Sequence, residues 1–166
     1  FHNVVDTAIA DSYLPFLKTA VRYPGFKFAV HYSGWLLEYI KDYNAETFGL
    51  LQKLAQSGQI EFFSGGFYEP ILAVIPSKYR QLQINKLNRF IEEHFGQKPK
   101  GLWLTERVWD PSIIPDLTAC GIEYVIVDDY HFISAGFDKS SLYGYYQTEQ
   151  DGNRIKVFPI DQKLRY

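Results

Sequence analysis

The feature of this sequence that most limits its fold is a regular alternation between short apolar segments and longer amphipathic ones. The apolar segments have the length and the β-branched or aromatic content of buried strands. They lie at residues 25–33, 59–64, 100–106 and 123–129. Segments with helical spacing of apolar residues separate or follow them, at residues 34–43, 45–58, 77–96 and 110–121. Strands that alternate with helices form a parallel sheet covered by helices, so we predict an α/β fold.

Glycine and proline mark the ends of several predicted elements. Pro15 interrupts the first helical pattern, which predicts a kink or a break there. Gly58 and Gly96 follow two other helices at the position where glycine commonly ends a helix, and Ser77 is the expected N-cap of the second. Residues 142–160 contain an Asp-Gly pair between two strand-like segments, which predicts a hairpin.

Length, charge and cysteine content exclude several classes of protein. The 166 residues suit one domain, and 17 Lys and Arg against 19 Asp and Glu give a formal net charge of −2. This balance offers no basic surface for nucleic acid, and no apolar stretch approaches the roughly 18 residues of a membrane span. Cys120 is the only cysteine, so no internal disulfide forms and a cytoplasmic location is expected. The sequence has no methionine, and we expect a piece of a longer protein.

Polar side chains gather where the predicted strands end, on all four strands. The group comprises His31, Glu69, Glu106, Arg107, Asp128 and Asp129. Parallel strands have their carboxyl ends at one edge of a sheet, which is where the sites of βα proteins lie. We therefore expect these side chains to face a common site.

Glu106 is the first candidate for chemistry, and its neighbour Arg107 leaves two interpretations open. In the functional one, the guanidinium keeps the carboxylate ionised, which suits a nucleophile or an electrostatic stabiliser better than a general acid. In the structural one, the two side chains form an ion pair that caps the strand. Adjacent side chains on a strand point to opposite faces, which argues against direct contact.

Trp103, Trp109 and Glu69 are candidates for binding a sugar. Each tryptophan offers an apolar face for a sugar ring, and each also suits a protein core. In a regular strand Trp103 points away from Glu106, so a bend is needed to bring both into one pocket, whereas Trp109 lies in the following loop. Glu69 follows two glycines, which allow close approach of the backbone to a ligand or simply form a tight turn.

A metal site is a second interpretation of the fourth strand end. Asp128, Asp129, His131 and His31 supply two carboxylates and two imidazoles, a donor set that suits zinc or another transition metal. The structural alternative is a helix or loop capped by the aspartates, with His31 as a hydrogen-bonded core residue. Phosphate-loop, CxxC and GxSxG motifs are absent from the sequence.

Three stretches, FFSGGFYEPIL, GLWLTERVWDP and YVIVDDYHFISAG, resemble the catalytic region of glycoside hydrolase family 57, closest to its 4-α-glucanotransferase and α-amylase members. HYSGWLLEYI and VFPIDQKLRY also fit, so the resemblance covers almost the whole chain. It implies that residues 1–166 are part of one glycosidase catalytic domain, an incomplete (β/α)7 barrel of the TIM-like kind. Flanking strands and motifs would be missing at both ends.

The resemblance also implies a reaction and roles for individual residues. The enzyme would act on α-1,4-glucans or maltooligosaccharides with retention of configuration, without a cofactor or metal. Glu106 in LTERVW would be the nucleophile that forms a glycosyl-enzyme. Trp103 would line the donor sugar site, Glu69 in GFYEP would bind substrate, and His31 would lie at the same rim.

Further substrate-binding candidates at this rim are Arg107, Trp109 and Asp128. The acid/base aspartate of the family lies on a segment after Tyr166, and Asp129 is the stand-in for it within the chain. An HQP-type motif of the family would precede the chain. Residues 1–166 would then need the remainder of the parent chain as a partner and would be inactive alone.

Other functions compete with this one. A metal-dependent polysaccharide deacetylase also uses a βα barrel, with an Asp/His cluster at the strand ends. A non-catalytic glucan-binding piece would bind maltooligosaccharides without hydrolysing them. A truncated fragment without a function of its own is the remaining alternative.

Overall fold

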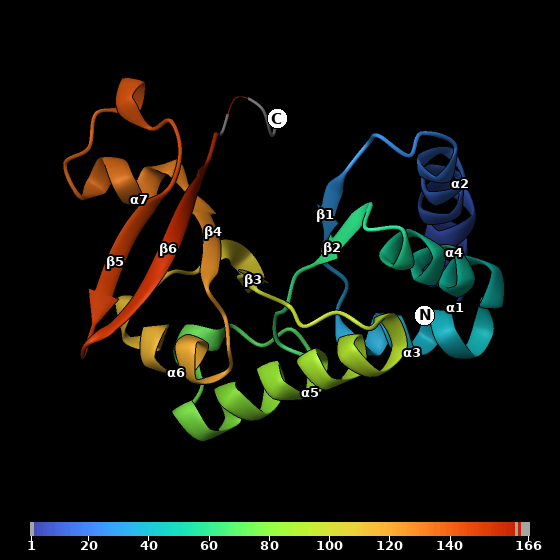
Figure 1. The fold of residues 1–166 in the computed structure, drawn as a ribbon. Coiled ribbons are helices and arrows are strands. Elements are labelled where there is room, and N and C mark those ends of the chain that lie inside the picture. Colours follow the sequence, from blue (N-terminus) through green and yellow to red (C-terminus); the bar gives the residue numbers. More distant parts are fainter. Residues whose placement is uncertain (1, 162, 164–166) are drawn as a thin grey trace.

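The computed structural model describes residues 2–161 and residue 163 (Figure 1). The strands are β1 (Phe28–Val30), β2 (Ile60–Phe62), β3 (Gly101–Trp103), β4 (Tyr124–Asp128), β5 (Tyr146–Gln150) and β6 (Asn153–Ile160). The α-helices are α1 (His2–Ala8), α2 (Leu14–Arg22), α3 (Gly34–Tyr43), α4 (Ala45–Gln56), α5 (Ser77–Phe95), α6 (Ile114–Ala119) and α7 (Asp129–Ser134). Within the described ranges, the helices are too short or too polar to cross a membrane.

Five of the strands run parallel, which confirms the predicted α/β fold with a parallel sheet. β1 pairs with β2, while β3, β4 and β6 form a second parallel group. Ser64 joins the two groups, because its N–H donates to the Gly101 carbonyl at 2.8 Å and its carbonyl accepts from the Trp103 N–H at 2.9 Å. The parallel order is therefore β1-β2-β3-β4-β6, and the carboxyl ends of these strands share one edge.

Helix α5 connects the two halves of the hydrophobic core. Leu87, Ile91 and Phe95 are buried in a first core cluster with α2, α3, α4 and the strands β1 and β2. Ile84, one turn before Leu87, is buried in a second cluster with β3, β4, β6 and α6. In Figure 1 this helix runs beneath both groups of strands. One long amphipathic helix thus fixes the two strand groups relative to each other.

The helix ends confirm most of the boundaries expected from glycine and proline. Pro15 lies in the first turn of α2, directly after a π-helical turn at Ile9–Tyr13 that separates α2 from α1. The backbone stays helical from residue 2 to residue 22, and the wider π-helical turn just before Pro15 accommodates the proline within it. Gly58 and Gly96 follow their helices with φ of 68° and 70°.

The N-cap predicted for α5 is wrong. Pro76 occupies that position, and Ser77 is the first helical residue. The Ser77 hydroxyl donates to the Asp116 carboxylate at 2.6 Å instead of capping its own helix. A tertiary partner in α6 thus outcompetes the local hydrogen bond that the sequence pattern favours.

All four predicted strands end earlier than expected, β1 at Val30 and β2 at Phe62 among them, and one pairing was not foreseen. The third strand stops at Trp103 and is followed by a tight turn at Thr105–Arg107, while Asp129 already belongs to α7. The predicted hairpin forms around Asp151, which has a positive φ of 52°. Its second strand, β6, also pairs in parallel with β4, a long-range contact that a local turn motif does not reveal.

Candidate active site

The ends of β1 and β2 are connected by a hydrogen bond between two candidate residues. His31 Nε2 lies 2.6 Å from Glu69 Oε1, and His31 Nδ1 lies 3.4 Å from the carbonyl oxygen of Phe63. Glu69 follows the turn that begins at Gly66, whose carbonyl accepts from the Glu69 N–H at 3.1 Å. The prediction that His31 and Glu69 lie at the same edge is consistent with this contact.

Glu106 lies in the tight turn that follows β3. Its side chain is exposed, and its backbone has a φ of 53°, followed by a φ of 55° at Arg107. The turn is closed by a hydrogen bond from the Arg107 N–H to the Leu104 carbonyl at 2.8 Å. The chain leaves the extended conformation before Glu106. The alternation of side chains between the two faces of a strand, which would point Glu106 and Trp103 in opposite directions, therefore no longer applies.

Arg107 connects this turn to the end of β4. Its Nε donates to Asp128 Oδ2 at 2.7 Å, across the parallel pair of β3 and β4. The guanidinium that was expected to act on Glu106 or to pair with it is therefore engaged by Asp128. Asp128 is the N-cap residue of α7 by position, but its side chain makes no capping hydrogen bond. The contact anchors the turn that carries Glu106.

Backbone strain is concentrated at the candidate carboxylates. Among residues 2–161 and 163, the non-glycine residues with positive φ are Glu69, Glu106, Arg107 and Asp151. Asp151 is explained by the hairpin turn, where positive φ is required. The other three lie in the turns after β2 and β3, and left-handed backbone costs a non-glycine residue about 1–2 kcal/mol. Strain of this kind persists where the surrounding structure enforces it, commonly at functional sites.

This strain predicts an unusual order of stabilities for two variants at Glu106. We expect Glu106→Gly to be more stable than Glu106→Ala by about 1 kcal/mol, because glycine adopts positive φ without a steric penalty. At the exposed helical residue Glu93 the order should reverse by about the same amount, since glycine destabilises a helix. Denaturant unfolding of the four variants measures both differences. If the alanine variant were more stable than the glycine variant at both positions, backbone strain at Glu106 would be contradicted.

The two tryptophans occupy different surroundings. Trp103 is the last residue of β3 and is half-buried, opposite Ile126 in the register with β4. Trp109 packs against the second core cluster and lines a pocket of about 190 Å³ together with His131 and Val127. Trp103 therefore stays close to the turn with Glu106, while Trp109 contacts the core near α7.

Asp129 is buried at the start of α7 and pairs with a lysine. Lys139 Nζ lies 2.8 Å from Asp129 Oδ2. The hydrogen bond to Asp129 raises the pKa of Lys139 above its ordinary value, and the charges of Asp129 and Asp161 act in the same direction, against a smaller effect of desolvation. Both partners of the pair line a pocket of about 800 Å³ with Tyr143. Sequence reasoning did not identify Lys139, which lies in a loop without a motif.

The predicted metal ligands are distributed over separate contacts. Asp128 pairs with Arg107, Asp129 with Lys139, and His31 with Glu69. In the described part of the chain, no three His, Cys, Asp or Glu side chains form a group suited to a metal ion. Asp128, Asp129 and His31 thus serve ion pairs and hydrogen bonds in this structure, while His131 lines the pocket beside Trp109.

A pocket of about 480 Å³ adjoins His31 and Glu69 at the end of β1. Aromatic side chains contribute much of its wall, from Tyr13, Tyr32 and Trp35. Burial, with a smaller effect of the neighbouring Tyr13, raises the pKa of Tyr32 to about 12, so its hydroxyl keeps its proton at neutral pH. Trp35 was not predicted as a site residue, because it falls within a helical pattern.

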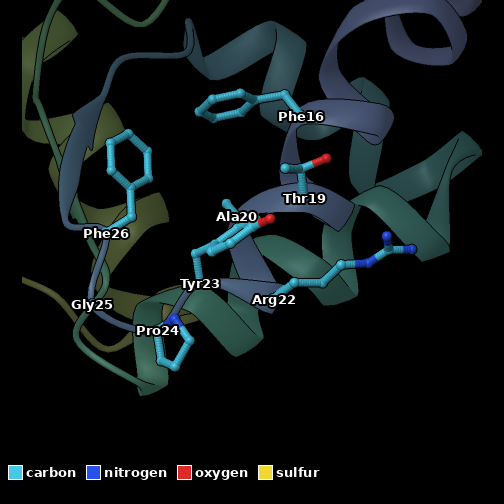
Figure 2. A pocket seen from close by; sticks show the side chains of 8 residues that line it. All are labelled: Phe16, Thr19, Ala20, Arg22, Tyr23, Pro24, Gly25 and Phe26. Carbon is cyan, nitrogen blue, oxygen red and sulfur yellow. The ribbon is translucent and has the colours of Figure 1, made fainter.

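Another pocket, of about 680 Å³, lies near the amino end of β1 (Figure 2). Figure 2 shows the rings of Phe16 and Phe26 at this pocket and Arg22 pointing away from both. Phe26 precedes β1, whereas the candidate carboxylates follow the carboxyl ends of strands. This pocket is therefore separate from the candidate active site.

Comparison with known proteins identifies relatives that match along the whole chain. The model of Glycosyl hydrolase family 57 matches residues 1–166. A 4-alpha-glucanotransferase of Thermococcus kodakarensis is 52% identical over 166 residues, which are 100% of this chain and 25% of that protein. Alpha-amylase 1 of Dictyoglomus thermophilum is 48% identical over 166 residues, again 100% of this chain and 24% of that protein.

A solved structure agrees with the fold. The crystal structure of 4-alpha-glucanotransferase from Thermococcus litoralis superposes with a TM-score of 0.97 and 47% sequence identity, covering 100% of this chain and 26% of that one. The chain thus spans about a quarter of the length of the relatives that it matches. Since the family model covers every residue and the relatives match along the full chain, the chain belongs to glycosyl hydrolase family 57.

Proposed function

We propose that the protein containing this chain is a retaining enzyme that cleaves α-1,4-glucans, with Glu106 as its nucleophile. Family membership supports the reaction class, and the names of the relatives support an α-glucan or maltooligosaccharide as substrate. Residues 1–166 would form part of one (β/α)7-barrel catalytic domain. The five parallel strands would be consecutive members of that barrel, completed by the remainder of the chain. The cytoplasmic location remains a prediction from the sequence.

The observation that carries this proposal is the conformation of Glu106. Its carboxylate is exposed at the edge where the parallel strands end, in a left-handed turn that the Arg107–Asp128 contact holds in place. Attack on the anomeric carbon requires a carboxylate that is accessible and fixed in this way. The C–O bond to the leaving sugar breaks as the bond from Glu106 to the anomeric carbon forms, and a general acid protonates the departing oxygen.

The two subclasses differ in what resolves the glycosyl-enzyme. Water releases a free sugar, as in an amylase, whereas the 4-hydroxyl of a second glucan gives transfer, as in a glucanotransferase. Both routes restore the α-configuration because each involves two inversions. Trp103 and Glu69 would hold the donor sugar, and Arg107, Asp128 and Trp109 remain substrate-binding candidates.

Proton NMR of the first products tests the proposed reaction. We expect the whole protein to release or transfer sugars from maltohexaose in the α-configuration before mutarotation. New oligosaccharides longer than the substrate would identify transfer. One new reducing end for each glycosidic bond cleaved would identify hydrolysis. Products that first appear in the β-configuration would refute a retaining mechanism.

Asp129 is a poor acid/base in this arrangement, and we propose that the acid/base lies on the protein beyond residue 166. A general acid must carry a proton to the leaving oxygen, yet Asp129 Oδ2 is occupied by the Lys139 ammonium at 2.8 Å and is buried. Its geometry instead suits a residue that fixes the loop carrying Lys139.

Rescue by azide distinguishes an acid/base role of Asp129 from a structural role in fixing the loop that carries Lys139. With an activated donor such as maltosyl fluoride, loss of a true acid/base leaves the glycosyl-enzyme intact, and azide then resolves it to an α-glycosyl azide. We expect Asp129→Gly in the whole protein to give no such product and no azide-dependent rate increase. Formation of the α-glycosyl azide would assign the acid/base to Asp129 after all.

The competing functions receive less support. The family match favours a glycosidase over a metal-dependent polysaccharide deacetylase, and the carboxylates here pair with arginine and lysine. Residues 1–166 taken alone would provide part of the glucan-binding edge but no acid/base. A non-catalytic glucan-binding role of that part is separated from catalysis by the NMR measurement, since binding alone yields no new product.

A further inference from the structure

The contact between His31 and Glu69 joins a half-buried imidazole to a more exposed carboxylate. The side chain of His31 is 13% exposed and that of Glu69 is 37% exposed, with 2.6 Å between Nε2 and Oε1. The second nitrogen, Nδ1, faces the Phe63 carbonyl at 3.4 Å. Both ring nitrogens thus face oxygen acceptors, which fixes the orientation of the ring, and the shorter contact favours the tautomer with its N–H on Nε2, toward the carboxylate.

Gly65 makes this arrangement sterically possible. A Cβ atom at position 65 would lie 2.5 Å from His31 Cε1, too close for any real contact. The turn that delivers Glu69 thus packs its glycine against the Cε1 edge of the imidazole. Gly66 is restricted in a similar way by Pro70, with 2.5 Å between its hypothetical Cβ and Cδ of the proline. The turn is therefore shaped to accommodate both the imidazole and the strained Glu69.

We propose that His31 is a positioning residue that acts through Glu69 and does not itself contact the substrate. By holding Oε1, it leaves Oε2 of Glu69 to accept a hydrogen bond from a hydroxyl of one glucose unit. That unit would occupy the 480 Å³ pocket beside Glu69, with the ring of Trp35 in its wall. The inference rests on the proposed function for the substrate class only.

The contact with His31 preorganises the Glu69 carboxylate for binding. Glu69 has a φ of 54° and a partly exposed side chain, so without a partner its carboxylate would sample several rotamers before binding. A charge-assisted hydrogen bond of 2.6 Å restricts it to one of them before the sugar arrives. Misplacing a binding group by about 1 Å costs on the order of 100-fold in a well-organised site.

A coupling measurement separates positioning from direct sugar binding and from a structural role. In the whole protein made inactive by Glu106→Gln, calorimetry with maltohexaose gives the Kd of His31→Leu, Glu69→Ala and the double variant. We expect each single change to raise Kd roughly 10- to 100-fold, and the double variant to bind no worse than Glu69→Ala alone. The conservative His31→Gln, which retains a donor near the position of Nε2, should recover most of the affinity.

A matched histidine variant and a steric variant at Gly65 accompany this measurement. His2→Leu, the same change at an exposed histidine on α1, should leave Kd unchanged. Gly65→Ala should weaken binding as His31→Leu does, with no further loss when Glu69 is already alanine. Independent, additive losses from His31→Leu and Glu69→Ala would overturn the positioning role, because they would mean that the two residues bind separately.

Failure of the proposed function is recognised separately. If no variant with intact His31 and Glu69 binds maltohexaose, the glucan substrate is wrong, whatever His31 does. The positioning role of His31 is then tested by nitrogen-15 NMR, which measures how fast the Nε2–H proton of its ring exchanges with solvent. It should be protected from exchange in the unmodified protein and lose that protection in Glu69→Ala. Unchanged protection would overturn the inference without reference to sugar binding.

Discussion

Replacing Glu106 with glutamine in the whole protein is expected to lower the turnover of α-1,4-glucans roughly 10⁴-fold or more, as for other residues that act as nucleophiles. The amide keeps the size of the side chain but cannot form the bond to the anomeric carbon. Because Glu106 is exposed, the substitution should leave the folded structure intact. Initial rates with maltohexaose, together with the unfolding midpoint of the same preparation, measure both effects.

Two further variants test whether the loss of turnover is specific to a nucleophile at position 106. Glu93→Gln, the same change at an exposed residue of α5, should retain full turnover. Glu106→Gly leaves room for azide, which should attack maltosyl fluoride directly and give a β-glycosyl azide by a single inversion while fluoride departs. Wild-type turnover in Glu106→Gln, or an α-configured azide from Glu106→Gly, would show that another group is the nucleophile.

Replacing Asp116 with alanine is expected to cost about 3–5 kcal/mol of folding free energy, the largest stability effect that the structure predicts. Asp116 is 6% exposed and accepts hydrogen bonds from the Ser77 hydroxyl and the Gln81 amide, both at 2.6 Å. It also pairs with the buried guanidinium of Arg80, whose Nε donates to the Leu72 carbonyl at 2.8 Å. Removing the carboxylate leaves the arginine charge buried without its partner.

Denaturant unfolding tests this cost against a surface control. Asp42→Ala on α3 removes an exposed aspartate and should change stability by less than about 0.5 kcal/mol. Replacing Arg80 and Asp116 together by apolar residues should recover part of the loss, because no unpaired charge then remains. A change of less than about 1 kcal/mol for Asp116→Ala would show that this network does not hold α5 and α6 together.

The same network predicts the direction of an acid effect on stability. Burial opposes the charged form of Asp116, but hydrogen bonds from Ser77, Gln81 and Arg80 outweigh it and hold its pKa below the ordinary value. A carboxyl with a depressed folded-state pKa stabilises the fold above its unfolded pKa, near 4, and loses this contribution as the pH falls further. In Asp116→Ala the decline in stability below about pH 4 should therefore be shallower than in the unmodified protein.

Sequence patterns predicted the parallel α/β fold because each strand and helix has a local signature. Apolar strand segments, helical spacing and glycine at Gly58 and Gly96 all depend on residues close together in the chain. The pairing of β6 with β4 and the engagement of Ser77 by Asp116 depend on residues far apart. The contact with Asp116 overrode the local expectation at the N-cap of α5, whereas the pairing with β4 was added to a hairpin that formed as predicted.

The sequence predicted that the candidate residues follow parallel strands with a common edge, while their roles in a site stay predictions. What the sequence did not reveal is how the side chains pair across that edge. Arg107 is adjacent to Glu106 in the chain, yet its guanidinium pairs with Asp128, because the left-handed turn after β3 directs it toward β4. Positive φ at a glutamate or an arginine, as at Glu106 and Arg107, is enforced by the surrounding structure and has no sequence signature.

Locating the covalent intermediate tests the central claim most directly. A donor with a good leaving group and a slow second step, such as a 5-fluoro-α-glucosyl fluoride, should trap a glycosyl-enzyme in the whole protein. Proteolysis and mass spectrometry should then find one added glycosyl group, on the peptide that contains Glu106 and bonded to that residue. A glycosyl group attached to any other residue, with Glu106 unmodified, would contradict the assignment of the nucleophile to the turn after β3.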